Sequence, residues 1–163
     1  ASDTGFFRFR NATSSAHRDA AKLIDCGAQF RKVAIHLSER KTRSELCLME
    51  KSLSTMEQHY DEKIVTIMIK KEFHERCGTS IDDGEGIVDL ARSIPGAAVA
   101  ILLREVNEST TRVSMRSEEN VNVGAIAKSL GGGGHKVAAG CTLHHSIDEA
   151  KQIVINLVGK ELP

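Results

Sequence analysis

The sequence predicts an α+β fold in which a helical linker is followed by a mixed β-sheet domain with helices packed on it. Three observations lead to this prediction. Apolar residues recur at three- and four-residue steps in the first part of the chain, as they do in amphipathic helices. From residue 64 onward, β-branched runs alternate with helical segments in the order β-α-β-β-α-β-α, and we expect the helices on one side of the sheet. Four consecutive glycines, 131–134, lie between two apolar segments of this second part.

The first part of the chain is expected to contain the end of a strand and three helices. Alternating bulky residues over 6–9 indicate the strand end. The run Thr13-Ser14-Ser15 can cap a helix that stops near Gly27. Apolar spacing predicts a second helix over 30–37 and a third over 42–58, and the Leu and Met side chains of these helices are expected to form a core.

The second part begins with a β-branched run over 64–69, which is typical of a buried strand. Asn122 can cap a short helix, and Ser146 with Glu149 forms a capping box for the last one. The remaining elements follow from periodicity and turn signals: a helix over 84–93, strands over 97–106 and 111–117 joined by a polar hairpin loop, a helix over 122–130, a strand over 137–143 and a helix over 146–159.

Composition limits the classes of function. The 163 residues include 22 Lys and Arg against 22 Asp and Glu, so the formal net charge is zero. This argues against a protein that coats nucleic acid through bulk charge, because such binding depends on neutralised phosphates. There is no Trp and only one Tyr, which leaves few aromatic rings for stacking bases. Any anion site must be small and local.

The cysteines and the chain start indicate a cytoplasmic protein. No C-x-x-C pair occurs, and we expect reduced, mostly buried thiols at Cys26, Cys47, Cys77 and Cys141. No run of 18 apolar residues is present, so no membrane partner is expected. The chain begins Ala1-Ser2-Asp3, which is neither a start methionine nor a signal peptide. We therefore expect this to be part of a longer protein.

The glycine run is the strongest candidate for a binding loop. Without Cβ atoms, Gly131 to Gly134 permit positive φ and close approach of backbone N–H groups to a ligand. His135 and Lys136 can then donate to an anion, while Ala138, Ala139 and Gly140 keep the next segment thin. A flexible linker is the alternative. The flanking apolar segments and the absence of serine favour a loop that cradles phosphate.

The pattern GGGGH-x-x-AAG at 131–140 resembles the signature of the DHH-associated domain of the DHH phosphoesterase superfamily. Within that superfamily the chain is similar to the oligoribonucleases (nano-RNases) that also dephosphorylate 3′-phosphoadenosine 5′-phosphate. The resemblance extends over nearly the whole chain, through residues 2–9, 92–94, 99–105, 113–117 and 121–123. It implies the end of a catalytic domain over 1–12, a helical linker over 13–60 and a DHH-associated nucleotide-binding domain over 61–163.

The resemblance also implies a metal-dependent hydrolase. In the family, the aspartate that corresponds to Asp3 is a ligand of a manganese pair that activates the attacking hydroxide. The other ligands come from D-x-D and Asp-His-His motifs, and this chain contains neither. We therefore expect no catalytic residue and no tightly bound metal here, and we expect this chain alone to be inactive. We read the carboxylates at 61–62 and 82–83 as solvated charge.

The expected substrate-binding residues surround the glycine run. Arg104 and Arg116 are placed near the ends of two strands, and a hairpin could bring both guanidinium groups together as a phosphate clamp. Two unrelated surface arginines are the alternative. His135 is expected to donate to a phosphate or a base, and no role is assigned to the six other histidines. The expected substrate-binding set is Arg104, Arg116, Ser117, Gly132, Gly133, Gly134, His135, Ala138 and Ala139.

We therefore predict the substrate-binding part of a manganese-dependent exoribonuclease that takes short oligoribonucleotides or nucleotides. A homodimer of the whole protein is a further expectation. The alternative is a non-catalytic nucleotide- or RNA-binding module, as in the related domain of alanyl-tRNA synthetase. The residues at 3–6 and the three predicted helices argue against that alternative.

Overall fold

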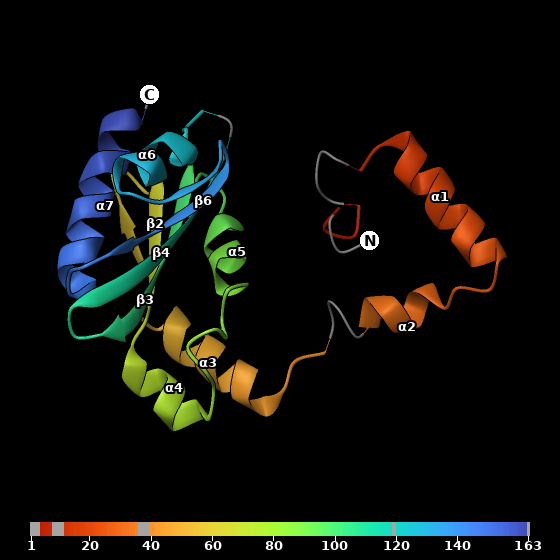
Figure 1. The fold of residues 1–163 in the computed structure, drawn as a ribbon, viewed down its shortest axis with the longest axis horizontal. Coiled ribbons are helices and arrows are strands. Elements are labelled where there is room, and N and C mark those ends of the chain that lie inside the picture. The colour runs from red at the N-terminus through yellow and green to blue at the C-terminus, as the bar shows by residue number, and fades with distance from the viewer. Residues whose placement is uncertain (1–3, 8–11, 36–39, 119, 163) are drawn as a thin grey trace. The chain divides into compact units, whose positions relative to one another are not determined.

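The computed structural model describes residues 4–7, 12–35, 40–118 and 120–162. The chain divides into two compact units, one comprising residues 1–42 and the other residues 43–163 (Figure 1). Each unit is described by itself below. Asp3 lies outside the described residues.

The first unit contains two helices that bury none of their residues. Helix α1, Ser14–Asp25, begins as predicted at Thr13, whose side chain accepts a hydrogen bond from the Ala16 N–H. Helix α2 spans Phe30–Ala34, and residues 36 and 37 of the predicted helix lie outside the described residues. Residues 4–7 form a turn with positive φ at Phe6 and Phe7. A strand over 6–9 is therefore wrong for residues 6 and 7, and residues 8 and 9 lie outside the described residues.

The second unit is built on one mixed sheet, as predicted. Its strand order is β1-β2-β3-β4-β6-β5, in which β2 and β3 are parallel and every other neighbouring pair is antiparallel. The strands are β1, Glu57–His59; β2, Ile64–Ile69; β3, Val99–Asn107; β4, Thr110–Ser117; β5, Gly133–His135; and β6, Ala138–Leu143.

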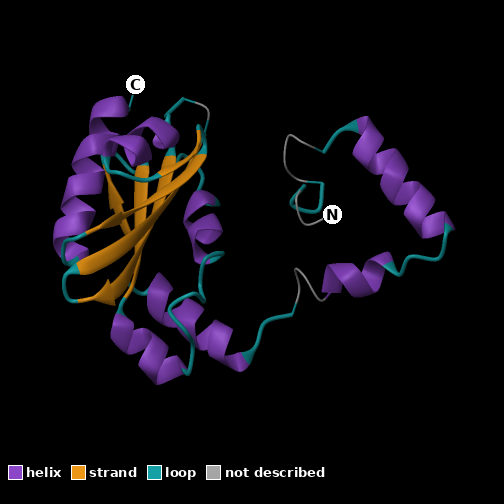
Figure 2. Cartoon of the chain, viewed as in Figure 1, coloured by secondary structure: helices purple, strands orange, loops and turns teal. Residues whose placement is uncertain are grey.

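Helices cover both faces of this sheet, so the prediction of helices on one side is wrong (Figure 2). The core on one face includes residues of α6, Val123–Ser129, and α7, Ile147–Glu161. The core on the other includes residues of α3, Arg43–Leu53, α4, Lys71–Cys77, and α5, Ile87–Arg92.

The parallel pairing of β2 with β3 explains why helices also cover the second face of the sheet. Parallel neighbours require a crossover connection, and α4 and α5 provide it on one face. The sequence predicts no helix over 71–77, so α4 is an addition to the predicted elements. All six residues of β2 are buried, as expected for a strand covered on both faces. Leu48 of α3 is only 1% exposed and belongs to the same core as α4 and α5.

A disulfide joins Cys47 of α3 to Cys77 of α4, so the prediction of reduced thiols is wrong for this pair. The two residues are 30 positions apart, and only the packing of α3 on α4 brings them together. The other two cysteines are free: Cys26 is exposed and Cys141 is buried. Burial raises the pKa of the Cys141 thiol.

Two further predicted helix caps are confirmed in the second unit. The Asn122 side chain accepts a hydrogen bond from the Ala125 N–H at the start of α6. Ser146 and Glu149 form a complete capping box at the start of α7. None of the helices in the described residues is long and apolar enough to cross a membrane.

Candidate functional site

The register of β4 and β6 places several polar residues on one face of the sheet. Side chains alternate between the two faces of a strand, and paired residues of neighbouring strands share a face. The odd-numbered residues of β4 and β6 from Thr111 to Met115 and from Ala139 to Leu143 are buried. The opposite face is more open, because its residues are partly or fully accessible except Ser114: Arg112, Ser114, Arg116, Ala138, Gly140 and Thr142. This set, with β5, is called the groove face below.

The glycine run forms a turn followed by the edge strand β5. Gly133, Gly134 and His135 pair with Gly140, Ala139 and Ala138 of β6, respectively. The pairing places Gly133 and His135 on the groove face, and both are exposed. The predicted loop is thus ordered by a ladder of backbone pairs, which a flexible linker would lack.

The glycines of the run are required for different structural reasons. A Cβ on Gly132 would collide with the Gly140 carbonyl oxygen. One on Gly134, where φ is 138°, would lie 2.6 Å from the Ala138 carbonyl oxygen. Gly133 has no positive φ, and no heavy atom among the described residues lies within 4 Å of the position its Cβ would take. Gly133 therefore leaves space open on the groove face.

Arg104 and Arg112 are directly paired across β3 and β4. Arg104 is only 7% exposed, and its buried Nε makes no hydrogen bond with the described residues. Burial lowers the pKa of Arg104, the carboxylate of Glu85 opposes this shift, and the neighbouring Arg112 adds to it. Arg112 Nη1 lies 2.9 Å from Oδ1 of Asp82, which precedes α5.

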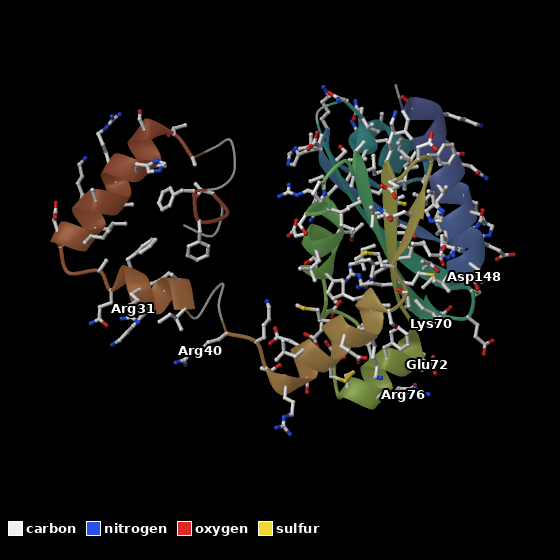
Figure 3. The ribbon with its side chains drawn as sticks, turned by 180° about the vertical axis from the view of Figure 1, so that it is seen from behind. Arg31, Arg40, Lys70, Glu72, Arg76 and Asp148 are labelled. Atoms are coloured by element: carbon white, nitrogen blue, oxygen red, sulfur yellow. A yellow bond between two sulfur atoms is a disulfide. The ribbon has the colours of Figure 1, made fainter. Side chains whose placement is uncertain are left out.

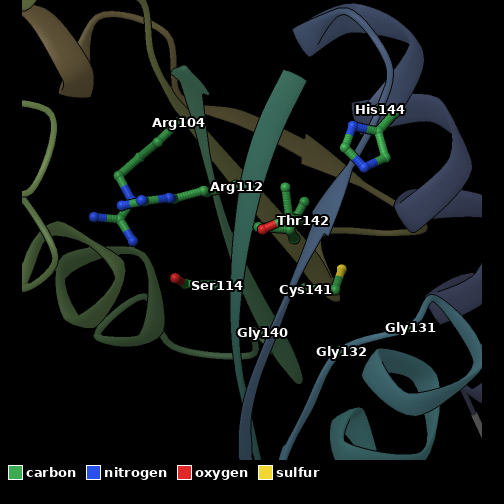
Figure 4. Close-up of a pocket in the computed structure, with 10 residues that line it drawn as sticks. Arg104, Arg112, Ser114, Gly131, Gly132, Gly140, Cys141, Thr142 and His144 are labelled. Atoms are coloured by element: carbon green, nitrogen blue, oxygen red, sulfur yellow. The ribbon is translucent and has the colours of Figure 1, made fainter. Parts of the chain in front are cut away.

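A pocket of about 520 Å³ lies beside this arginine pair (Figure 4). Figure 4 shows Arg104, Arg112 and Ser114 on one side of it and Gly131 and Gly132 on the other. Its lining consists of Arg104, Arg112, Val113, Ser114, Gly131, Gly132, Gly140, Cys141, Thr142 and His144.

The register separates Arg104 from Arg116, so the predicted clamp of these two arginines is wrong in its geometry. Strands β3 and β4 are antiparallel, and Arg116 pairs with Ala100 rather than with Arg104. Arg116 lies four residues beyond Arg112, roughly 13 Å along the strand at about 3.3 Å per residue. It is half-buried, and its Nη1 donates to the Met115 carbonyl oxygen at 3.1 Å. Arg116 instead shares its end of the groove face with Ala138 and His135.

Three of the predicted residues belong to the other face, and one of them is Gly134, which pairs with Ala139. Ser117 is buried, and its hydroxyl donates to the Val121 carbonyl oxygen at 2.8 Å. Ala139 is part of the core beneath α6 and α7. The structure therefore brings Gly133, His135, Ala138 and Arg116 together, places Arg104 and Gly132 around the pocket, and leaves Ser117, Gly134 and Ala139 on the other face. The roles assigned to these residues in binding stay predictions.

Sequence reasoning missed Arg112, Ser114 and His144, which line the pocket. Alternation along β4 from Arg116 would have indicated Ser114 and Arg112. The carboxylates read as solvated charge also have partners: Asp82 pairs with Arg112, and Asp83 accepts hydrogen bonds from the N–H and hydroxyl of Ser80. These bonds hold the pKa of Asp83 below its usual range.

The described residues offer no donor set for the manganese pair that the resemblance implies. No group of three or more His, Cys, Asp or Glu side chains among them is placed to hold a metal ion. The predicted ligand, Asp3, lies outside the described part of the chain. No chemical step through a metal is derived from these residues.

Comparison with known proteins identifies a domain in the second unit. Residues 76–160 match the model of the DHHA1 domain. The chain is 36% identical over 161 residues to the bifunctional oligoribonuclease and PAP phosphatase NrnA of Thermus thermophilus. The match covers 98% of this chain and 48% of that protein, so the chain spans about half the length of this relative.

Two solved structures have folds similar to that of this chain. An exopolyphosphatase-related protein from Bacteroides fragilis matches 98% of this chain and 47% of its own, with a TM-score of 0.89 and 25% identity. The pGpG-specific phosphodiesterase PggH from Vibrio cholerae matches 97% of this chain and 53% of its own. Its TM-score is 0.52 and its identity 16%, so this likeness concerns the fold alone.

Proposed function

The chain belongs to the DHHA1 domain family, and from this premise we propose that it binds the substrate of a metal-dependent phosphoesterase. The proposed substrates are short oligoribonucleotides and 3′-phosphoadenosine 5′-phosphate. The name of the Thermus relative, an oligoribonuclease and PAP phosphatase, supports this choice.

One observation carries the proposal: the register places Arg116, His135 and Gly133 at one end of the open groove face. Guanidinium and imidazole N–H groups donate to phosphate oxygens, and the missing side chain at Gly133 leaves room for a ligand near the backbone. We call this the glycine-strand end. In the proposal it holds the phosphate and ribose of one nucleotide.

In this proposal, binding and bond cleavage belong to different parts of the protein. A catalytic domain would supply the carboxylates and histidines that hold manganese, and the chemistry that the metal would supply there is activation of water for hydrolysis. The chain described here contributes orientation of the substrate. Its lack of activity on its own, a homodimer of the whole protein and a cytoplasmic location stay predictions.

A titration with adenosine 5′-monophosphate tests the binding role. Backbone amide shifts of Gly131–Gly134 and His135 should change together as the nucleotide is added to the 163-residue chain. If these amide signals stay unchanged while signals of another surface move, β5 has a purely structural role. A parallel assay for phosphate release from 3′-phosphoadenosine 5′-phosphate, with manganese present, tests whether the chain alone is inactive.

A further inference from the structure

The arginine pair Arg104–Arg112 is not used by the glycine-strand end. Like charges placed directly opposite each other on neighbouring strands destabilise a sheet. Arg104 is also nine-tenths buried, which is costly for a charged group unless it is paired. Such an arrangement is expected where an anion binds between or beside the two guanidinium groups.

The arginine pair also contains a donor without a hydrogen-bond partner in the described part of the chain. Among the described residues, two buried side-chain nitrogen atoms make no hydrogen bond: Arg104 Nε and His74 Nε2. Of these two, only Arg104 lines the pocket. The unpartnered Arg104 Nε therefore belongs to the arginine pair itself. An acceptor oxygen beside Arg104 would satisfy a donor that the described residues leave without a partner.

Asp82 supplies part of that missing negative charge. Its Oδ1 accepts from Arg112 Nη1 at 2.9 Å, yet the Asp82 side chain is 78% exposed. Exposed ion pairs of this kind contribute little to stability, so a competing anion can displace the carboxylate easily. A phosphate presents oxygens that match the planar fork of arginine as well as a carboxylate does.

We propose that Arg104 and Arg112 form a second phosphate subsite, which Asp82 occupies in the absence of ligand. The inference rests on the proposed function and deepens it, since it specifies which substrates the groove prefers. The subsite lies roughly 13 Å from Arg116, measured as four residues along β4. A linear oligonucleotide carries a further phosphate to the second subsite, whereas a mononucleotide engages the glycine-strand end alone.

Asp82 is then a specificity-determining residue. Every ligand that reaches the second subsite must displace it from Arg112, and a ligand confined to the glycine-strand end does not. Removing the charge of Asp82 should raise the affinity for oligonucleotides and leave the affinity for mononucleotides unchanged. Removing the charge of Arg112 should lower the affinity for oligonucleotides and again leave the affinity for mononucleotides unchanged.

The test compares adenosine 5′-monophosphate with a 5′-phosphorylated triadenylate, both titrated calorimetrically into the 163-residue chain. The variants are Asp82→Asn and Arg112→Gln, with Asp148→Asn as the matched control. Asp148 lies in the first turn of α7, against the opposite face of the sheet, and the control removes the same charge as Asp82→Asn (Figure 3). Melting temperatures show whether each variant is folded.

We expect Asp82→Asn to raise triadenylate affinity about 3- to 10-fold and Arg112→Gln to lower it about 10-fold, with monophosphate affinity unchanged in both. The slope of log affinity against log salt should also be smaller by about 0.7 for triadenylate in Arg112→Gln, the value for one phosphate contact on a single strand. The control should match the parent chain.

Three results overturn the proposal. If all variants bind triadenylate like the parent while the monophosphate still shifts the β5 amides, the second subsite fails and the proposed function stands. If Asp82→Asn and Asp148→Asn raise affinity equally, the effect is one of net charge. If neither ligand binds the parent chain, the proposed function fails and the second subsite fails with it.

Discussion

Gly134 packs directly against Ala139, its partner in the β5–β6 register, so that a Cβ on Gly134 would lie 2.5 Å from the Ala139 Cα. Gly133, the preceding residue, has no such neighbour among the described residues. Two adjacent glycines in one motif thus have different reasons to be glycine, one for packing and one for open space.

This contrast predicts different outcomes for Gly134→Ala and Gly133→Ala. Gly134→Ala should lower the free energy of unfolding by about 1–3 kcal/mol through overpacking, and its φ of 138° adds strain. Gly133→Ala should melt close to the parent chain but bind adenosine 5′-monophosphate more weakly, because its methyl group projects onto the groove face. Thermal melts and a binding titration of both variants measure the two effects. Equal destabilisation by the two substitutions would contradict the register.

The disulfide gives a second prediction. Cys47 and Cys77 close a loop of 30 residues, and the loss of such a cross-link should lower the free energy of unfolding by about 3–4 kcal/mol. Urea denaturation of the chain with and without a reductant measures this difference. The variant Cys26→Ser is the matched control, because Cys26 is exposed and free. If the reductant leaves the parent chain's midpoint unchanged, the two cysteines are not bonded in solution.

The sequence predicted those elements whose signals are local. Capping by Thr13, Asn122 and Ser146 depends on residues three positions away, and the buried strand at 64–69 is an uninterrupted β-branched run. Helix α4 was missed because its seven residues are too few for a clear period and its N-cap, Lys70, makes no side-chain hydrogen bond. Gly78, in the left-handed conformation at its C-cap, was the available signal.

The groove face could be predicted from the sequence only in part, because it depends on pairing between strands. The glycine run was found from composition, but its conversion into strand β5 requires β6 as a template. The pairing of Arg104 with Arg112 depends on the hairpin register, which shifts between Glu105 and Asn107. A bulge of this kind is not visible in the sequence. The same register explains why Arg104 and Arg116 were wrongly placed together.

Buried His74 should make stability depend on pH. Burial lowers its pKa in the folded state, Asp83 opposes this shift and Arg104 adds to it, so the unfolded chain binds more protons as pH falls below about 6.5. The free energy of unfolding should therefore decrease from pH 7 to pH 5. The pKa of His59 is lowered in the same direction, again mainly by burial. His74→Gln should consequently reduce the slope without abolishing it, as urea titrations at several pH values can measure. A slope identical to that of the parent chain would show that His74 does not contribute.

Arg116 provides the most direct test of the glycine-strand end. It is half-buried, and the only hydrogen bond described for its guanidinium group goes to the carbonyl oxygen of the preceding residue, Met115. Truncation to alanine should therefore leave the melting temperature close to that of the parent chain. If Arg116 donates to the nucleotide phosphate, Arg116→Ala should weaken binding of adenosine 5′-monophosphate by about 1.5–3 kcal/mol, the range for a hydrogen bond to a charged group.

Arg76→Ala is the control for this substitution. Arg76 is exposed on α4, pairs only loosely with Glu72 at 3.4 Å, and does not line the pocket (Figure 3). Calorimetric titrations of the two variants should therefore differ by at least tenfold in affinity, with Arg76→Ala matching the parent chain. If both variants bind equally well, Arg116 is a surface arginine on the sheet and the nucleotide is held elsewhere. If both lose affinity equally, the interaction is one of general charge, and the register of β4 with β6 does not define the site.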